Sequence, residues 1–242
     1  MNKLTVVGIG PGSPDQMTLR AVQALKEAQV IAGYQVYVDL VRPHFPDKTY
    51  LVTPMRKEAD RCRMALDAAC EGRSVAMISS GDAGVYGMAG LIYELSQGRD
   101  VQIEVVPGVT AALSGGAVLG APLTHDFAVI SLSDLLTPWE KIEARLDCAS
   151  QADFCIVLYN PASRKRADYL RRATEILLRH KSPDTVCGAV RNIDRAGEAC
   201  TLMSLAELGD YQADMFTTVF IGNSQTLNLS GKMVTPRGYR DV

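Results

Sequence analysis

The chain has 242 residues, of which 47% are hydrophobic and 21% are charged, and its formal net charge is -2. This composition is typical of a folded globular protein and excludes a largely disordered one. Nucleic-acid-binding proteins usually carry a basic excess, so the charge argues against a nucleic-acid partner. Either one large domain or two packed lobes suits this length.

The first residues, MNKLTVVGIGPGS, hold a short apolar run that meets glycines at once. A signal peptide has a longer apolar core and a cleavage site of small residues. No later stretch approaches the ~20 consecutive apolar residues that a membrane-spanning helix needs. We therefore expect a cytoplasmic protein with no membrane partner.

The cysteines and histidines are scattered along the sequence. The six cysteines form no C-x-x-C pair, and His44, His125 and His180 are far apart in the chain. Neither pattern has the spacing of a zinc site. We predict that the protein side chains bind no metal and that the cysteines are reduced and mostly buried.

Short β-branched runs alternate with amphipathic stretches along most of the chain. The runs are LTVVGIG, SVAMISS, IEVVPG, FAVIS, FCIVLYNP and TVCGAV. This alternation predicts an α/β fold with a mostly parallel sheet in the N-terminal lobe. Ser13 is the predicted N-cap of the first helix, with Pro14 in its first turn and Gln16 completing a capping box. Its buried side should carry Leu19, Val22, Leu25 and the intervening alanines.

The pattern changes after Pro122, where short strands follow one another with few helices between them. These strands lie in AGEACTLMS, MFTTVFIGN and TLNLSGKMVT. They predict a C-terminal lobe with a mixed sheet that is partly antiparallel. Gly120 and Pro122 mark the boundary, so the predicted lobes are residues 1–119 and 120–242.

The first strand leads directly into a loop that contains Gly8, Gly10 and Gly12. A dinucleotide-binding fingerprint would have its third glycine where Ser13 stands, and Pro11 lacks the backbone N–H that would bind a pyrophosphate. We therefore interpret the loop as a tight turn whose backbone lets a neutral or cationic part of a ligand come close. The alternative is an ordinary turn between a strand and a helix.

Two further strand ends are rich in glycine and small residues, S-S-G-D-A-G-V-Y-G at 79–87 and V-V-P-G-V-T-A-A at 105–112. Ligands of α/β proteins bind at the carboxyl ends of parallel strands, so three such ends favour a small-molecule cleft. Asp82 can accept hydrogen bonds from a ligand there, or it can cap the following helix. The small residues around Thr110 can support a flat ligand or simply allow close helix packing.

The order of these motifs, followed by A-P-L-T-H-D-F and L-Y-N-P, resembles the tetrapyrrole methylase superfamily over nearly the whole chain. Members of this superfamily bind S-adenosylmethionine between two α/β lobes. Within it, the stretches 131–140, 159–166 and T-P-R-G-Y at 235–239 resemble the ring-contracting precorrin-3B C17-methyltransferases. In those enzymes, methylation of carbon 17 is coupled to extrusion of the meso carbon between rings A and D.

This resemblance implies a methyltransferase of cobalamin biosynthesis that converts S-adenosylmethionine to S-adenosylhomocysteine. Its partner would be a small-molecule tetrapyrrole, either metal-free precorrin-3B or cobalt-factor III, with cobalt present only as part of the substrate. The motifs S-S-G-D-A-G and D-L-L-T-P-W favour the cobalt-dependent form. The habit of the family also implies a homodimer.

Cofactor-binding residues are carried over from the family motifs one by one. Ser80 stands where the family usually has a glycine, which alters the expected geometry of the second loop. The implied cofactor-binding residues are Pro11, Gly81, Asp82, Tyr86, Thr110, Ala111, Leu158, Tyr159, Asn160, Ala189, Val190 and Arg191.

Methyl transfer to an electron-rich macrocycle needs alignment more than it needs a strong base. Ring contraction also calls for a proton donor. His125 and Asp126 are adjacent, so in an extended segment they point to opposite faces and form no dyad; each can instead be structural. The catalytic candidates are His125, Asp126, Ser131, Asp134 and Tyr37, with Ser133 and Asp39 as further options.

The carboxylate arms of such a substrate call for cations, above all for the forked guanidinium of arginine. We predict that Arg164, Lys165, Arg166 and Arg237 bind the substrate, and Arg191, Arg195 and Arg240 are further options. In contrast, we interpret Arg171, Arg172 and Arg179 as a solvated basic helix face.

Other functions remain open at this point. The chain can be a methyltransferase of the same fold that acts on another corrinoid carbon, on RNA or on a protein. The mild acidity and the few aromatic residues disfavour RNA. A non-catalytic tetrapyrrole carrier would have no use for the donor loops. A nicotinamide-dependent dehydrogenase is disfavoured by Pro11 and by the missing third glycine.

Overall fold

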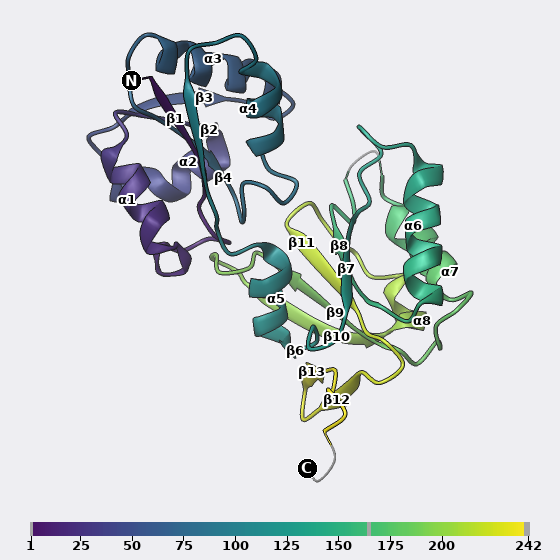
Figure 1. Cartoon of the computed structure of the whole chain (residues 1–242). Helices are drawn as coiled ribbons and strands as arrows, with labels where there is room; N and C mark the ends of the chain where they lie inside the picture. Colours follow the sequence, from purple (N-terminus) through teal and green to yellow (C-terminus); the bar gives the residue numbers. More distant parts are fainter. Residues whose placement is uncertain (1, 164–165, 240–242) are drawn as a thin grey trace. The chain divides into compact units, whose positions relative to one another are not determined.

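The computed structural model describes residues 2–163 and 166–239. The chain divides into two compact units, Met1–Ala111 and Ala112–Val242, each of which is built around its own sheet (Figure 1). The predicted α/β class is confirmed. No helix among the described residues is long and apolar enough to cross a membrane.

The first unit contains a five-stranded sheet in the order β3-β2-β4-β1-β5, in which every neighbouring pair is parallel. Parallel strands cannot be joined by a tight turn, so the chain returns through crossover connections that contain helices. These helices lie on both faces of the sheet. The strands are β1 (Lys3–Gly8), β2 (Val30–Tyr34), β3 (Thr49–Thr53), β4 (Val75–Ser79) and β5 (Gln102–Val106). The helices are η1 (Pro14–Gln16), α1 (Leu19–Glu27), α2 (Gln35–Val41), η2 (Arg42–His44), α3 (Glu58–Cys70) and α4 (Ala89–Leu95).

Side chains that alternate along β1 fill two apolar layers, one on each face of this sheet. Val6 packs in the cluster that includes Leu66 of α3 and Ile92 of α4. Its neighbour Val7 packs in the cluster that includes Leu25 of α1 and Val38 of α2. Because both faces are covered, the strand is buried continuously from Leu4 to Gly8 rather than at alternate positions.

The first α-helix begins later than predicted. Pro14–Gln16 forms a separate 3-10 turn in which Ser13 makes no side-chain capping hydrogen bond. Helix α1 begins at Leu19, and the hydroxyl of its N-cap Thr18 accepts a hydrogen bond from the Ala21 N–H at 3.1 Å. The prediction that Leu19 is buried is wrong, because the first helical residue points away from the sheet and is 90% exposed.

The second unit contains a mixed sheet in the order β10-β9-β11-β8-β7, in agreement with the prediction. Strands β7 and β8 are parallel, and β11 runs antiparallel to both β8 and β9. The strands are β7 (Phe127–Ser131), β8 (Cys155–Tyr159), β9 (Val186–Arg191), β10 (Ala199–Ser204) and β11 (Thr217–Ile221). A small second sheet holds β12 (Leu227–Leu229), β13 (Lys232–Val234) and β6 (Gly120–Ala121). The helices are α5 (Ala111–Leu119), α6 (Trp139–Gln151), α7 (Tyr169–Leu177) and α8 (Leu205–Leu208).

The division between the units falls after Ala111, the first residue of α5, whereas the predicted boundary followed this helix. Helix α5 packs closely on the second sheet. A Cβ atom at Gly115 would lie 2.9 Å from the ring of Phe220, and one at Gly188 would lie 2.7 Å from the side chain of Leu119. Glycine is needed at both positions for this close packing, which assigns the helix to the second unit.

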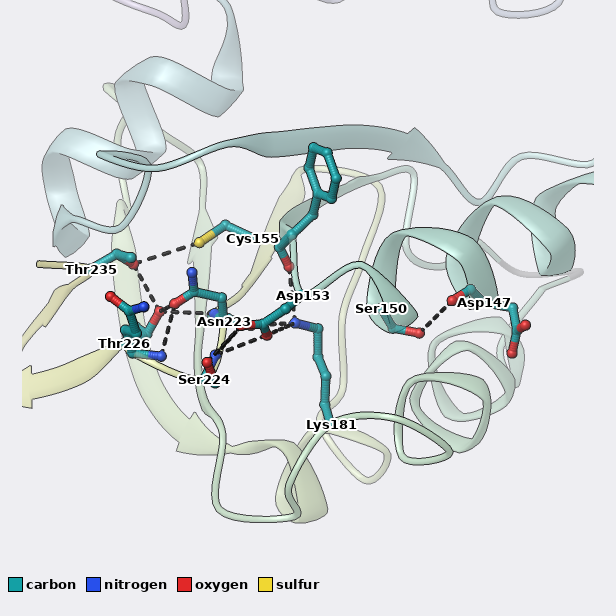
Figure 2. A network of polar contacts seen from close by, with 12 residues as sticks. Asp147, Ser150, Asp153, Cys155, Lys181, Asn223, Ser224, Thr226 and Thr235 are labelled. Carbon is teal, nitrogen blue, oxygen red and sulfur yellow. Dashed lines mark hydrogen bonds and ion pairs between the residues drawn. The ribbon is translucent and has the colours of Figure 1, made fainter. Parts of the chain in front are cut away.

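A buried lysine joins three segments of the second unit (Figure 2). The Lys181 ammonium, whose side chain is 2% exposed, donates to the carbonyls of Phe154 and Gly222 at 2.9 and 3.0 Å. It also lies 3.4 Å from the Asp153 carboxylate, which in turn accepts hydrogen bonds from Ser224. The charge is thus fully compensated, as a buried ammonium requires.

Half of the cysteines are buried and half are exposed, so the prediction that most are buried is wrong. All six are free thiols. Burial raises the pKa of the Cys62 thiol to about 11 and that of Cys187 to about 12. These two residues therefore behave as small apolar side chains.

Candidate functional site

Three glycines close the carboxyl ends of β1, β4 and β5 with almost no space between their backbones. A Cβ atom at Gly108 would lie 2.2 Å from the carbonyl oxygen of Gly81 and 2.6 Å from that of Gly8. A Cβ atom at Gly8 would lie 2.6 Å from the Gly108 nitrogen. Because backbone atoms cannot yield, no other residue fits at Gly8 or Gly108 without moving a strand end.

Gly10 extends this arrangement through a short antiparallel bridge to Gly81. The Gly10 N–H donates to the Gly81 carbonyl at 3.1 Å, and the Gly81 N–H donates to the Gly10 carbonyl at 2.7 Å. Both residues have positive φ angles, 75° and 65°, which favour glycine. We call Gly8, Gly10, Gly81 and Gly108 the glycine edge of the first unit.

Asp82 fastens the loop after β4 to the loop after β5. One carboxylate oxygen accepts a hydrogen bond from the Gly84 N–H at 2.7 Å, and the other accepts one from the Gly108 N–H at 2.9 Å. The alternative role as a helix cap does not hold, since Met88 is the N-cap of α4. Asp82 therefore fixes the shape of the glycine edge through two charge-assisted hydrogen bonds.

Of the other cofactor-binding residues predicted in the first unit, Pro11, Thr110 and Ala111 lie next to this edge, and Tyr86 lies in the loop that follows β4. Pro11 is buried directly after Gly10, and the Thr110 Cα would lie 3.4 Å from a Cβ atom at Gly81. Tyr86 is 55% exposed and has a φ of 53°, an uncommon value for a bulky residue that often marks functional sites. Ala111 follows Thr110 as the first residue of α5.

This edge presents backbone rather than side chains. A flat, largely neutral group such as an adenosyl moiety fits against bare backbone, because no side chains stand in its way. Pro11 contributes no N–H, so the loop is a poor grip for phosphate. The fit favours a nucleoside with a cationic or neutral tail over a dinucleotide.

Tyr37, a predicted catalytic residue, lies on α2 of the same unit. Its ring packs edge-on against Tyr34 with the centroids 5.3 Å apart. The nearby Asp39, on the same helix, accepts a hydrogen bond from Gln35 at 2.6 Å. Tyr37 and Asp39 thus each make a contact within the first unit that does not depend on a catalytic role.

In the second unit, parallel β7 and β8 place Ser131 and Tyr159 level with one another at their carboxyl ends. Asn160 follows with a φ of 54°, and its side-chain amide donates to the Ser131 hydroxyl at 2.9 Å. The Ser133 N–H donates to the same hydroxyl at 3.2 Å. The Tyr159 hydroxyl accepts a hydrogen bond from the Ala112 N–H at 2.8 Å.

Three predicted cofactor-binding residues, Leu158, Ala189 and Val190, have fully buried side chains. Each of the three residues lies in a strand that is paired with a neighbouring strand on both sides. Arg191, at the end of β9, is exposed and forms an ion pair with Asp214 at 2.7 Å. Although burial opposes it, hydrogen bonds from Thr217 and Arg191 lower the pKa of the Asp214 carboxyl.

Asp134 forms a polar group with Tyr169 and Arg166. The Tyr169 hydroxyl donates to Asp134 at 2.7 Å, and this hydrogen bond, together with burial, raises the pKa of Tyr169. Arg166 donates through Nε to Ser163 at 3.1 Å, and its Nη1 lies 3.9 Å from Asp134. That Nη1 is the one fully enclosed side-chain nitrogen without an acceptor among the residues described. No pattern in the sequence pointed to Tyr169, which lies 35 residues from Asp134 along the chain.

His125, Asp126 and Arg237 lie elsewhere in the second unit. His125 and Asp126 precede β7, and a five-residue strand separates them from Ser131 by roughly 16 Å. The Arg237 guanidinium lies 3.4 Å from the Thr124 carbonyl, close in the chain to His125. The predicted catalytic residues of this unit therefore do not form one group, because they stand at opposite ends of the same strand.

The remaining cations separate into distinct environments. Arg171 pairs with Asp210, and Arg179 pairs with Glu143 and Asp147, as expected for a solvated face. Arg172 differs, because it stacks 4.0 Å above the Trp139 ring. Arg164, Lys165 and Arg240 lie outside the described residues. Within the described ranges, no group of three or more His, Cys, Asp or Glu side chains is arranged to hold a metal ion.

Comparison with known proteins gives full-length similarities. A protein of Salmonella typhimurium named "Probable cobalt-factor III C(17)-methyltransferase" is 47% identical over 98% of this chain and 99% of its own length. A Sinorhizobium protein named "Precorrin-3B C(17)-methyltransferase" is 42% identical over 92% of this chain and 89% of its own length. The solved structure titled "Crystal structure of the methyltransferase CobJ" superposes with a TM-score of 0.92 at 38% identity, covering 98% of this chain and all of that one.

The family profile described as Tetrapyrrole (Corrin/Porphyrin) Methylases matches residues 3–209, which include the whole sheet of the first unit with its glycine edge and the second unit as far as α8. The resemblance inferred from the sequence motifs is therefore confirmed. The chain belongs to the tetrapyrrole methylase family.

Proposed function

We propose that the chain transfers a methyl group from S-adenosylmethionine to carbon 17 of cobalt-factor III, with ring contraction to cobalt-precorrin-4, in cobalamin biosynthesis. The observation that carries this proposal is the 47% identity, over nearly the full length of both chains, to the Salmonella protein. Precorrin-3B is the second candidate substrate, because the Sinorhizobium relative carries that name at 42% identity.

The donor is proposed to bind at the glycine edge of the first unit. Gly81 and Asp82 shape its floor, while Pro11, Tyr86, Thr110 and Ala111 form its surroundings. When bound, S-adenosylmethionine supplies an electrophilic methyl group. The residues align and shield the reactants, and alignment alone can contribute about 7 to 11 kcal/mol to the lowering of the barrier. The cofactor contacts of Leu158, Tyr159, Asn160, Ala189, Val190 and Arg191 stay predictions.

Ser131 and Asp134 are the proposed proton-handling residues for ring contraction. Asn160 and Ser133 both donate to the Ser131 oxygen, which orients its hydroxyl hydrogen away from them. Tyr169 donates to Asp134 and has a raised pKa, so it keeps its proton at neutral pH. A serine hydroxyl with a fixed orientation is a suitable donor to a developing oxygen charge. The roles of His125, Asp126 and Tyr37 are untested predictions.

Arg166 is proposed to bind a carboxylate of the substrate. Its enclosed Nη1 has no acceptor within hydrogen-bond distance, and the Asp134 oxygen at 3.9 Å is too far to serve. A carboxylate arm would complete this guanidinium in the bidentate manner that arginine favours. Arg164, Lys165 and Arg237 remain predicted substrate contacts, and the cytoplasmic location and the homodimer remain predictions as well.

The test is anaerobic incubation of the purified chain with cobalt-factor III and methyl-labelled S-adenosylmethionine, with precorrin-3B in a parallel reaction. The expected result is labelled, ring-contracted product from cobalt-factor III, identified by mass and by the position of the label. Label on another carbon, or no incorporation from either substrate, would overturn the assignment. Turnover of precorrin-3B alone would mean that the substrate is the metal-free compound.

A further inference from the structure

Another arginine, Arg61 on α3 of the first unit, is buried with few acceptors around it. Its side chain is 6% exposed, and Nη1 donates to the Thr53 hydroxyl at 2.7 Å. Its nearest carboxylate oxygen belongs to Glu58 and lies 3.8 Å from Nη2, beyond hydrogen-bond distance. A guanidinium has five N–H groups, and within the described part of the chain none of the Arg61 nitrogens is a fully enclosed atom without a partner, so those that do not donate to Thr53 keep access to solvent or a ligand.

The hydroxyl that meets Arg61 adds another donor. Thr53 is 8% exposed, and its oxygen is already used to accept from Arg61, which directs its own hydrogen elsewhere. The ring of Tyr34 lies 5.9 Å from the Arg61 guanidinium carbon and supplies a negative π face but no acceptor atom in the plane of the fork. The guanidinium is mostly buried and its nearest carboxylate, Glu58, makes no hydrogen bond to it, so a second anion at its accessible N–H groups would be stabilised by the positive charge.

The position of this group in the sheet identifies which anion it would meet. Tyr34 and Thr53 are register partners at the carboxyl ends of β2 and β3. Ala32, Met77 and Val6 lie side by side on β2, β4 and β1, so the residues two places further, Tyr34, Ser79 and Gly8, end at the same edge. Neighbouring strands are ~4.8 Å apart, which places the Arg61 group about 10 to 14 Å along this edge from β1 and its glycine.

We propose that Arg61, together with the Thr53 hydroxyl, binds one carboxylate arm of the tetrapyrrole substrate. This inference rests on the proposed function, since a ligand that meets the glycine edge and spans ~10 Å or more must be wide and carry anions at its rim. The guanidinium supplies the positive charge and paired N–H donors, and the Thr53 hydroxyl supplies a further donor. The bound carboxylate would take the place of Glu58 as the anion nearest to Arg61.

The experiment uses the whole chain and four variants: Arg61→Met, Arg61→Lys, Thr53→Val and, as the matched control on the same helix, Arg63→Met. Arg63 is 53% exposed and pairs with Asp60 at the surface. For each variant, the KM for cobalt-factor III and the Kd for S-adenosylhomocysteine are measured. Arg61→Met should raise KM at least tenfold, Arg61→Lys and Thr53→Val several-fold, and none should change the Kd by more than twofold. Arg63→Met should change neither constant.

An unchanged KM in a folded Arg61→Met protein would overturn the proposal, as would a parallel loss of S-adenosylhomocysteine affinity, which indicates a structural role. If Arg61→Met does not fold, Thr53→Val decides, because it leaves the buried charge in place. Binding of uroporphyrin III, a polycarboxylate tetrapyrrole, is followed by fluorescence quenching and needs no turnover. Weaker binding by Arg61→Lys than by the control would support the site even if cobalt-factor III is not the substrate, and equal binding would reject it.

Discussion

The Asp82 carboxylate accepts a hydrogen bond from the backbone N–H of Gly108 at 2.9 Å, which links the loops that follow β4 and β5. Its other oxygen accepts from Gly84 within its own loop. One side chain thus holds together two strand ends that are 26 residues apart in the sequence. Its effect on ligand binding would be exerted through the shape of the backbone.

Replacing Asp82 with Ala should weaken S-adenosylhomocysteine binding about 10- to 100-fold. The variant loses two hydrogen bonds to a charged acceptor, each worth roughly 1.5 to 3 kcal/mol, and a tenfold change in Kd corresponds to about 1.4 kcal/mol. Titration calorimetry measures the change. The matched control is Asp47→Ala at an exposed position after η2, which should bind as the unmodified chain does. Equal affinities for both variants would show that the pocket lies elsewhere.

Replacing Gly108 with Ala should lower the free energy of unfolding by about 3 kcal/mol, because the new methyl group would lie 2.2 Å from a carbonyl oxygen. Gly90→Ala is the control. Gly90 lies inside α4 with no atom within 4 Å of its built Cβ, so this change should stabilise the chain by about 0.5 to 1 kcal/mol. Thermal and urea unfolding give both values. A Gly108→Ala chain as stable as Gly90→Ala would contradict the close backbone contact.

Replacing Lys181 with Met should destabilise the second unit by roughly 2 to 3 kcal/mol, since two buried carbonyls lose a charged donor. Met keeps the length of the aliphatic stem, so the loss reports the ammonium rather than a cavity. Lys141→Met, on the exposed side of α6, should change the free energy of unfolding by less than ~0.5 kcal/mol. Similar values for the two variants would mean that the network of Figure 2 contributes little.

Glu104 on β5 links Lys3 and Arg20, and hydrogen bonds from these two residues lower its pKa. The folded-state pKa therefore lies below the unfolded value of ~4.3. The stabilisation is complete above that value and is lost as the pH falls through the folded-state pKa. Glu104→Gln should reduce stability at neutral pH and flatten the decline below pH ~4.5. Glu94→Gln, at an exposed position of α4, should keep the slope of the unmodified chain.

Sequence patterns predicted the fold class and the glycine-bearing strand ends because strand periodicity and turn chemistry are local. They did not identify β2 and β3, whose sequences VIAGY and TYLVT are short and lie between other signals. The start of α1 was placed too early because Pro14 favours both a 3-10 turn and a helix start. Both errors concern short segments in which two local structures have similar propensity.

The grouping of the site residues depends on tertiary contacts that no local pattern contains. From the sequence, Asp82 was predicted to contact a ligand or to cap the following helix. In the structure, its hydrogen bond from Gly108 joins the loops that follow two separate strands. Tyr169 pairs with Asp134 across 35 residues. Conversely, His125 and Ser131 are close in the sequence but stand at opposite ends of β7, since an extended strand separates its two termini by its full length.

The central claim is that the methyl donor binds at the carboxyl ends of β1, β4 and β5 in the first unit. A crystal structure with S-adenosylhomocysteine tests it most directly. The account predicts a nucleoside in contact with the backbone of Gly81 and the residues around Asp82, with Gly8 and Gly108 packed beneath it. A nucleoside bound away from these strand ends, or at the amino ends of the same sheet, would contradict it.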